Sequence, residues 1–526
     1  MPTMTAATAR KVVAFVLVGL FAGACGTTVS PAPSRTPGAT ARPPATPTPT
    51  PEPPLFPLAV IARFTDLRVS LEQEELAAAL AGGDVLAPCG LEELALGDED
   101  LPLPDPAACL PPAEVVAKVR AKGGPLGLVP VGSVSPAVKV LRLGDADLFG
   151  SPSRRAQPYP LVGVGGSVDP AAVAYDAREV RTLISLGDTC PDRGVSQQTI
   201  GLGRGWDWAL DGGTAHYTGI AVDRRYTGRD GNGWPVVRAV RVGDHGKIRA
   251  ILQDADITID DFECPMVENF TQARGNSTIF SIDPRVAPLL ADAGVDLVTI
   301  GSNHITDRGT RGLRQTMDYL DEVGIEHVGA GMDLAEALAP GVVEVRGLRF
   351  AFLGWDSTIG SLDATADSPG VATMSTANLR VSIRRAREAG DIVIGLPQWN
   401  WPEYYAEFTS RALKQRDTLY ELGVDHILGA GTHWAGAMSL TAGEAGDARP
   451  QLAVTSHGNF LFGQDWSRQT QEGVIYELTF YGTRLAQVRI IPYIMLDQAQ
   501  PNVTDPLSDG AYVQKQVFNA SIFELP

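Results

Sequence analysis

The sequence predicts an α/β protein whose main part contains a mixed or parallel β-sheet. Apolar runs of strand-like composition are each followed, at their carboxyl ends, by polar side chains. Because the carboxyl ends of parallel strands meet at one edge of a sheet, these side chains are expected to converge there. Amphipathic and hairpin segments lie between or after the runs. The runs are residues 182–186, 255–260, 295–300, 391–396 and 424–428.

The first 25 residues have the pattern of an export signal. Arg10 and Lys11 precede an apolar stretch, residues 12–21, that is too short to span a membrane. Small residues directly before Cys25 resemble a lipobox, which predicts lipidation of Cys25 and anchoring at the outer face of the cell membrane. Leu20 and Phe21 lie one or two places early for this motif, so ordinary cleavage and secretion is the alternative.

Residues 26–57 are dominated by Thr, Pro, Ala and Ser. Such a composition cannot bury apolar surface and favours extended polyproline geometry. We therefore expect a semi-rigid linker.

Residues 58–165 are predicted to form a small α/β domain. A polar cap precedes a helical run at 69–81, and a second helix is expected at 113–121. Strands are expected at 125–131 and 138–143. The segment resembles part of one lobe of a periplasmic binding protein, without a recognisable ligand-binding loop, so a structural or docking role is expected.

Residues 180–526 are predicted to form the main domain. Leu313, Met317 and Leu320 recur on one face of a helix that ends near Gly324. Hairpins are expected around residues 346–347 and 481–482, where a turn containing Gly joins two apolar runs. Alternating strands and helices combined with hairpins predict a mixed sheet.

Several short motifs occur in this domain in a fixed order. They are Gly187-Asp188, Asp261-Phe262-Glu263, Ser302-Asn303-His304 with Asp307 and Gly309, residues 328–331, residues 352–354, and Ser456-His457-Gly458-Asn459-Phe460 followed by Glu472-Gly473. Over residues 180–495 this order resembles the CapA family, the poly-γ-glutamate capsule-synthesis proteins of the calcineurin-like metallophosphoesterase superfamily. The resemblance implies a four-layer αββα sandwich and a metal-dependent site.

The chain departs from the family pattern at two places. Residues 398–400 are Gln-Trp-Asn where the family commonly has His-Trp-Gly, and residues 429–433 are Gly-Ala-Gly-Thr-His where it commonly has Gly-His-His-Pro-His. Position by position, the resemblance leaves as metal ligands Asp188, Glu263, Asn303 and His433. It places His304 beside them as the catalytic residue, acting as acid or electrophile.

This ligand set predicts a site for one metal ion and not for two. Two carboxylates, one amide and two imidazoles, with a carbonyl oxygen from Gln398, suffice for one divalent ion of unknown identity, but they are few for two ions. A metal-free pocket is the alternative.

Aromatic side chains cluster at the predicted strand ends and suit an extended polymer or sugar-like ligand. The predicted substrate-binding residues are Gln398, Trp399, Glu403 and Trp434. Ordinary core or rim packing would explain some of these aromatic residues equally well.

Four cysteines follow Cys25, and disulfides persist in an exported protein. The simplest pairing joins Cys89 to Cys109 and Cys190 to Cys264. The second bridge would hold the strand ends that carry Asp188 and Glu263. The alternative is that Cys190 or Cys264 is a thiolate ligand.

The formal net charge of −18 argues against binding of nucleic acid, which requires a basic surface. It also opposes a polyglutamate polymer at long range. A local basic segment that carries His216, Arg224, Arg225 and Arg229 is a candidate for relieving this repulsion, and a solvated loop is the alternative. The expected partners are an anionic surface polymer or another cell-envelope component, and the membrane through the lipid anchor.

The sequence predicts one of two functions. The first is metal-assisted hydrolysis or transfer in polymer synthesis, export or anchoring. The second is non-catalytic binding of a polymer or partner protein.

Overall fold

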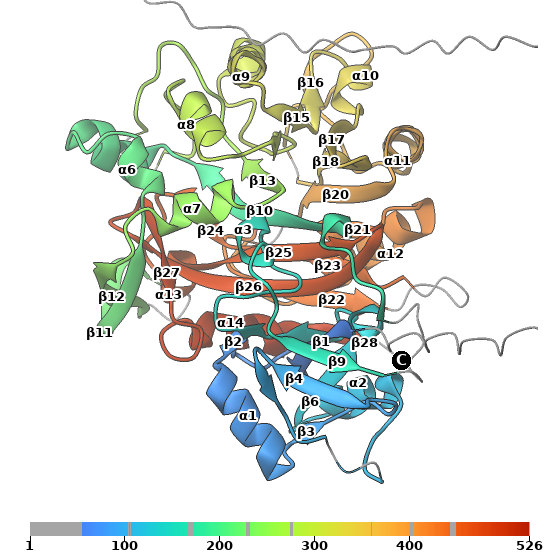
Figure 1. The fold of residues 1–526 in the computed structure, drawn as a ribbon. Coiled ribbons are helices and arrows are strands. Elements are labelled where there is room, and N and C mark those ends of the chain that lie inside the picture. The colour runs from blue at the N-terminus through green and yellow to red at the C-terminus, as the bar shows by residue number, and fades with distance from the viewer. Residues whose placement is uncertain are drawn as a thin grey trace, which may run out of the picture. The chain divides into compact units, whose positions relative to one another are not determined.

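The computed structural model describes residues 55–103, 105, 107–165, 173–227, 232–273, 277–358, 360–399, 403–441 and 449–524 (Figure 1). The chain divides into two units, Met1–Glu52 and Pro53–Pro526, and all described residues belong to the second. The predicted export signal, Cys25 and nearly all of the predicted linker lie outside the described residues. The described part is a mixed α/β structure with several sheets.

The first sheet is built by residues 55–164. Its strand order is β3 (Val85–Leu86), β6 (Leu126–Pro130), β1 (Leu55–Arg63), β9 (Leu161–Val164), β4 (Glu93–Leu96) and β5 (Glu99–Asp100), with β7 (Val138–Val140) paired to β1. The predicted helices are confirmed as α1 (Gln73–Gly82) and α2 (Pro112–Arg120). Strand β1 begins at Leu55, before the predicted end of the linker, because Leu55 and Phe56 pair with β9.

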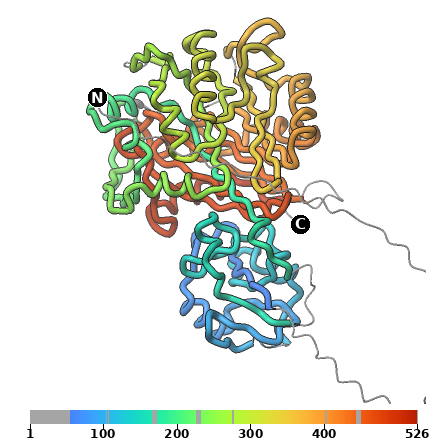
Figure 2. Tube along the Cα trace, turned by 45° about the horizontal axis from the view of Figure 1, so that its top comes forward, coloured from blue at the N-terminus to red at the C-terminus, as the bar shows by residue number. Residues whose placement is uncertain are grey.

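The second sheet has ten strands and is mixed. Its order is β12 (Gly233–Gly243), β11 (Thr214–Thr227), β27 (Gln500–Thr504), β26 (Arg484–Leu496), β25 (Glu472–Tyr481), β10 (Val180–Cys190), β13 (Ile257–Phe262), β14 (Leu297–Thr299) and β15 (Glu326–Val328), with β24 (Asn459–Phe462) beside β10. Strands β10, β13, β14 and β15 are parallel, as expected from the apolar runs. In Figure 2 the red C-terminal strands run beside the green ones of this sheet.

The third sheet contains the other predicted strands. Its order is β17 (Gly341–Val345), β18 (Leu348–Asp356), β20 (Ile392–Gln398), β21 (His426–Leu428), β23 (Gln451–Val454), β22 (Met438–Thr441) and β28 (Ile522–Glu524). Strands β18, β20, β21 and β23 are parallel. The predicted hairpins around residues 346–347 and 481–482 are confirmed as β17–β18 and β25–β26.

The second and third sheets share one hydrophobic core, in which Leu183 and Ile257 of one pack with Phe350 and Ile394 of the other. Other apolar clusters join each sheet to helices. The helices are α7 (Lys247–Gln253), α8 (Val286–Asp292) and α9 (Gly309–Val323) for the second sheet, and α11 (Thr376–Ala389) and α12 (Ser410–Leu422) for the third. Helix α9 buries the predicted face and ends at Gly324, whose φ is 77°.

The remaining short elements connect or cap these layers. They are β2 (Ser70–Leu71), β8 (Arg142–Leu143), α3 (Pro152–Arg155), α5 (Arg193–Ser196), α6 (Asp207–Leu210), β16 (Ala330–Gly331), α10 (Leu334–Ala337), β19 (Gly370–Val371), α13 (Arg468–Gln471) and α14 (Ala511–Ala520). None of the described helices is long and apolar enough to cross a membrane.

Candidate metal centre

The carboxyl ends of strands from two sheets meet at one place. Asp188, near the end of β10, pairs in register with Asp261 of β13 and with Asn459 of β24. From the third sheet, Gln398 ends β20 and forms a bridge to Ala430, which follows β21. The predicted convergence of strand ends is therefore present.

Three of the predicted ligands lie together. Ligand atoms of Asp188, Glu263 and His433 are all within 4.8 Å of one another, and all three residues are buried. His433 Nδ1 lies 2.8 Å from Asp188 Oδ2, and the Gly431 N–H donates to Asp188 Oδ1 at 3.1 Å. Gln398 Nε2 donates to Glu263 Oε1 at 3.2 Å, which adds the predicted amide to the cluster.

Close backbone contacts hold this cluster in place. A Cβ on Gly187 would lie 1.9 Å from the Gly458 carbonyl oxygen, to which the Asp188 N–H donates a hydrogen bond of 3.0 Å. Only glycine therefore fits at position 187. His433 has a φ of 61° and Tyr404 a φ of 62°, and their rings lie 5.7 Å apart. Left-handed backbone at non-glycine residues is costly and tends to occur at functional sites.

The cluster brings several acidic groups together in a buried place. Burial, reinforced by the charge of Asp188, raises the pKa of both Asp261 and Glu263 well above their ordinary values. Burial lowers the pKa of His433, but its hydrogen bond to Asp188 and the charges of Asp188 and Glu263 outweigh this and raise it to about 9. One imidazolium thus faces several buried carboxyl groups.

The residues present fit one divalent cation. Within the described part of the chain, Glu263 Oε2 and Gln398 Oε1 are buried and have no hydrogen-bond partner. Buried oxygens without a donor are costly, and carboxylate, amide and imidazole donors suit a hard or borderline divalent ion. The cluster therefore offers both the donor chemistry and the uncompensated charge that a cation would satisfy.

Asn303 and His304 lie in the loop after β14. Asn303 Oδ1 accepts a hydrogen bond of 3.4 Å from Ser302 Oγ. His304 Nδ1 lies 3.1 Å from Asp307 Oδ2, and the His304 ring packs 4.8 Å from that of Phe280. Phe280 contacts Phe462, which contacts His433 at 5.0 Å. Two phenylalanine rings therefore connect His304 to the cluster.

The predicted substrate-binding residues take different positions. Trp399 is only 4% exposed and belongs to the core beside the third sheet, 6.0 Å from Phe408, so it offers no open face to a ligand. Trp434 is half-buried and packs edge-on against Trp234 at 6.3 Å. Glu403 adds its charge near His433 and Tyr404.

Three further residues of the site occur in the predicted motifs but had no assigned role. Asp261 adds a buried carboxyl group, Asn459 Oδ1 lies 2.9 Å from His433 Nδ1, and His457 Nε2 lies 2.8 Å from Ser185 Oγ. Burial lowers the pKa of His457 to about 4, so this imidazole is neutral. Their place in the motifs Asp261-Phe262-Glu263 and Ser456–Phe460 was the signal that could have identified them.

Both predicted disulfides are present. Cys89 is bonded to Cys109, and Cys190 is bonded to Cys264. The alternative role of Cys190 or Cys264 as a thiolate ligand is wrong, because each sulfur is already bonded to the other. The second bridge joins segments directly after Asp188 and Glu263, which lie two and one residues away.

Residues 182–464, which include the whole cluster, match the protein family described as "Bacterial capsule synthesis protein PGA_cap". The chain is 25% identical over 266 residues to capsule biosynthesis protein CapA of Bacillus anthracis, covering 49% of the chain and 62% of the relative. It is 24% identical over 241 residues to PGA biosynthesis protein CapA of Bacillus subtilis, covering 45% and 61%. The match thus spans less than two thirds of either relative.

Among solved structures, a putative 5′-nucleotidase from Staphylococcus aureus aligns with a TM-score of 0.29 and 11% identity, covering 50% of this chain and 49% of that one.

Proposed function

The chain belongs to the family of bacterial capsule synthesis proteins that matches its residues 182–464, and from this premise we propose a function in the synthesis, export or anchoring of a poly-γ-glutamate type surface polymer. The two Bacillus relatives, named for capsule and PGA biosynthesis, support this proposal. The polymer would be the anionic partner of the protein. The net charge of −18 disfavours nucleic acid as a partner.

We propose that the chemistry is metal-assisted hydrolysis or transfer at a phosphoester or amide-like bond. The observation that carries this proposal is the buried cluster of Asp188, Glu263 and His433, whose ligand atoms lie within 4.8 Å of one another. When bound there, a divalent ion would supply Lewis-acid polarisation of a substrate oxygen. Gln398 and Asn303 are the neutral oxygen ligands of this proposal.

The protein's own groups would have separate tasks in that reaction. Asp188 and Glu263 offset the charge of the cation, and His433 supplies an imidazole nitrogen. His304 would donate a proton to the leaving group. With a proton on Nδ1, its ring donates to Asp307 Oδ2 at 3.1 Å, which leaves Nε2 for the exchange of a proton. Glu403 and Trp434 would contact the substrate outside the cluster.

We also propose the four-layer αββα arrangement of metallophosphoesterases for residues 180–526. The core shared by the second and third sheets and the separate helix clusters of each sheet support it. Residues 58–165 are proposed to form a small domain, supported by their own sheet and apolar core.

Export with lipid anchoring through Cys25 is the proposed location, and secretion after ordinary cleavage is the alternative. Two disulfides support an oxidising compartment outside the cytoplasm.

A non-catalytic binding protein of the same fold is the second candidate function. One observation favours it: His433 Nδ1 already lies within hydrogen-bond distance of both Asp188 Oδ2 and Asn459 Oδ1, at 2.8 and 2.9 Å. The imidazole of His433 therefore has acceptors within the protein that do not require a cation. The protein would then bind a polymer or partner protein without turnover.

Metal analysis combined with activity assays separates the two candidates. Purified protein would be titrated with Mn²⁺ and Zn²⁺, and hydrolysis of bis-p-nitrophenyl phosphate and of a γ-glutamyl anilide would be followed. An enzyme binds one equivalent of metal, and its activity is lost in His304→Ala and Glu263→Gln but kept in His245→Ala, an exposed histidine outside the site. Capture of polyglutamate without metal-dependent turnover would establish the binding protein instead.

A further inference from the structure

A second cavity lies at a distance from the candidate metal centre. It has a volume of about 530 Å³ and is lined by residues of the 142–154 segment, β10, α7, β26 and β27. On β10 it is lined by Thr182 and Ile184, whereas Asp188 lies near the other end of the same strand. At about 3.3 Å per residue, Thr182 and Asp188 are roughly 20 Å apart. The cavity is therefore a separate site.

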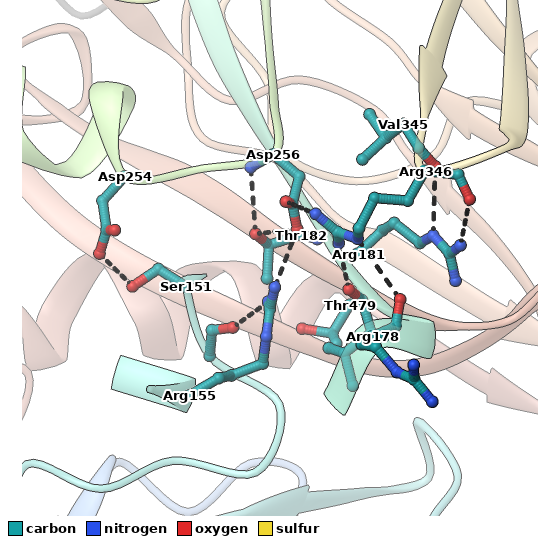
Figure 3. A network of polar contacts seen from close by, with 12 residues as sticks. Ser151, Arg155, Arg178, Arg181, Thr182, Asp254, Asp256, Val345, Arg346 and Thr479 are labelled. Atoms are coloured by element: carbon teal, nitrogen blue, oxygen red, sulfur yellow. Dashed lines mark hydrogen bonds and ion pairs between the residues drawn. The ribbon is translucent and has the colours of Figure 1, made fainter. Parts of the chain in front are cut away.

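A network of polar contacts lies beside this cavity (Figure 3). Asp256 accepts hydrogen bonds from the Thr182 N–H at 2.9 Å, from Arg155 Nη2 at 3.2 Å and from Arg346 Nη1 at 2.6 Å. Asp254, which lines the cavity, accepts a hydrogen bond from Ser151 Oγ. It also accepts one from the Ser153 N–H at 3.0 Å. These contacts attach the 151–155 segment to the second sheet, so the cavity is pre-formed.

The lining combines an apolar wall with a charged end. Ile251, Ile491 and Val503 line the cavity and remain partly exposed. Glu477 and Arg489 lie at the buried end, where Arg489 Nη1 is 3.3 Å from Glu477 Oε1 and Arg489 Nη2 is 3.0 Å from Asp147 Oδ1. An apolar wall with a few polar groups is the usual composition of a small-molecule site.

Arg154 is one of the cations that line this cavity, and its guanidinium has no hydrogen bond to the described part of the chain. Its guanidinium has charge interactions with Glu477, Arg489 and Asp254, but it donates no hydrogen bond to any described residue. Arg155, in contrast, bonds Asp256 and the Gly150 carbonyl oxygen at 2.7 Å. Burial lowers the pKa of Arg154, yet a guanidinium stays protonated at neutral pH. A half-buried cation with unused donors faces the cavity.

We propose that this cavity binds a small organic monoanion whose carboxylate pairs with Arg154 and whose aliphatic body packs on Ile251, Ile491 and Val503. A carboxylate matches the planar fork of one guanidinium. A phosphate would bring a second negative charge towards Glu477 and Asp254, which line the same cavity. The site is independent of the proposed function and of the metal centre.

Octanoate is the probe for this proposal, with octanol as its neutral counterpart and octyl phosphate as the dianion. Calorimetric titration of the full chain is expected to show saturable one-to-one binding of octanoate. Loss of a charge-assisted pair predicts at least about tenfold weaker binding by Arg154→Gln. Arg384→Gln, an exposed arginine of α11, should bind octanoate as the wild type does. Octanol should bind at least about tenfold more weakly than octanoate and be insensitive to Arg154→Gln.

Three results would overturn the proposal: no saturable octanoate binding by the wild type, equal affinity in Arg154→Gln, or tighter binding of octyl phosphate than of octanoate. If Arg154→Gln does not fold, two further measurements decide. Arg154→Lys keeps the charge but loses the planar fork, so it should weaken octanoate binding. Ile251→Phe, at a partly exposed position, changes the shape of the apolar wall and should also weaken octanoate binding. Unchanged binding in both variants would refute the site.

Discussion

Two buried histidines, only seven residues apart, lie at opposite ends of β21 and differ in charge. His426 starts the strand, is 3% exposed, and its Nδ1 accepts a hydrogen bond of 3.3 Å from the Leu452 N–H. Burial lowers its pKa to about 4. His433 follows the strand and is 5% exposed, but the carboxylate of Asp188 raises its pKa to about 9. Burial is nearly equal, so the partner decides the protonation state.

This difference shows what the carboxyl edge of the sheets provides. At that edge Asp188 and Glu263 surround one imidazole, whereas at the amino end of β21 the nearest polar partner of His426 is a backbone amide. Buried carboxylates that have no arginine partner are costly unless a cation neutralises them. An ordinary core position holds no such charge and needs no cation. Four experiments test this difference between the surroundings of His433 and His426.

The largest effect is expected from Asp188→Asn, which keeps the shape of the side chain but removes its charge. Affinity for Mn²⁺ or Zn²⁺ should fall by more than about 100-fold, beyond the usual effect of losing an outer-shell partner. The pKa of His433 should fall markedly, because its main partner is gone. Calorimetry and NMR titration of the histidines would measure both. Asp318→Asn, an exposed aspartate of α9, is the control. An unchanged metal affinity would exclude Asp188 as a ligand.

The disulfide beside the cluster provides the second test. Replacing Cys190 and Cys264 with Ala opens a loop of 74 residues and should lower the free energy of unfolding by about 4 kcal/mol in the chain-entropy picture. The matched control replaces Cys89 and Cys109, which are 20 residues apart, and should cost about 3 kcal/mol. Only the first pair should weaken metal binding. Equal metal affinity in both variants would show that the bridge does not position Asp188 and Glu263.

The pH dependence of stability should differ between the two histidines in the metal-free protein. His426 has a lowered pKa in the folded state, so its contribution is present above pH 6.5 and is lost as the pH falls towards 4. The loss amounts to about 3 kcal/mol. His433 has a raised pKa, so its contribution is present below pH 6.5 and is lost as the pH rises through 9, again by about 3 kcal/mol.

Urea unfolding of wild type, His426→Asn and His433→Gln at about pH 5, 7 and 10 would measure these contributions. His426→Asn should flatten the acid limb and His433→Gln the alkaline limb. A variant that flattens the opposite limb would contradict the assigned protonation states.

The smallest effect is expected from Asn459→Ala. Asn459 Oδ1 lies 2.9 Å from His433 Nδ1 and helps to orient the ring. Loss of such an outer partner should weaken metal binding by about tenfold. The same substitution at Asn378 of α11, whose Nδ2 donates to the Thr373 carbonyl oxygen at 3.1 Å, should leave metal binding unchanged. A wild-type affinity in Asn459→Ala would mean that Asp188 alone orients His433.

Much of the fold and part of the site could be predicted from the sequence. The apolar runs and their polar ends depend on local patterns, and these predicted the parallel strands, the meeting of Asp188 with Glu263 and His433, and both disulfides. The CapA-like motifs aligned the same residues. The local sequence pattern was sufficient for these features, because residues at the carboxyl ends of parallel strands lie at the same edge of the sheet.

Other features depend on packing between distant segments, which the sequence did not reveal. The ring contacts that link His304 through Phe280 and Phe462 to His433 are one example. Trp399 follows a strand end yet turns into the core. The seven-stranded first sheet starts at Leu55 because that apolar residue finds a partner in β9, far along the chain.

The hydrogen bond from Gly431 to Asp188 joins residues that are 243 positions apart in the sequence. This large sequence separation affects how the protein folds. Contacts of such high sequence separation close slowly, because the intervening chain must first lose conformational freedom. The cluster is therefore expected to form among the last contacts of folding. A nascent chain or a partly refolded intermediate would lack the assembled cluster even when most of its helices and strands have formed.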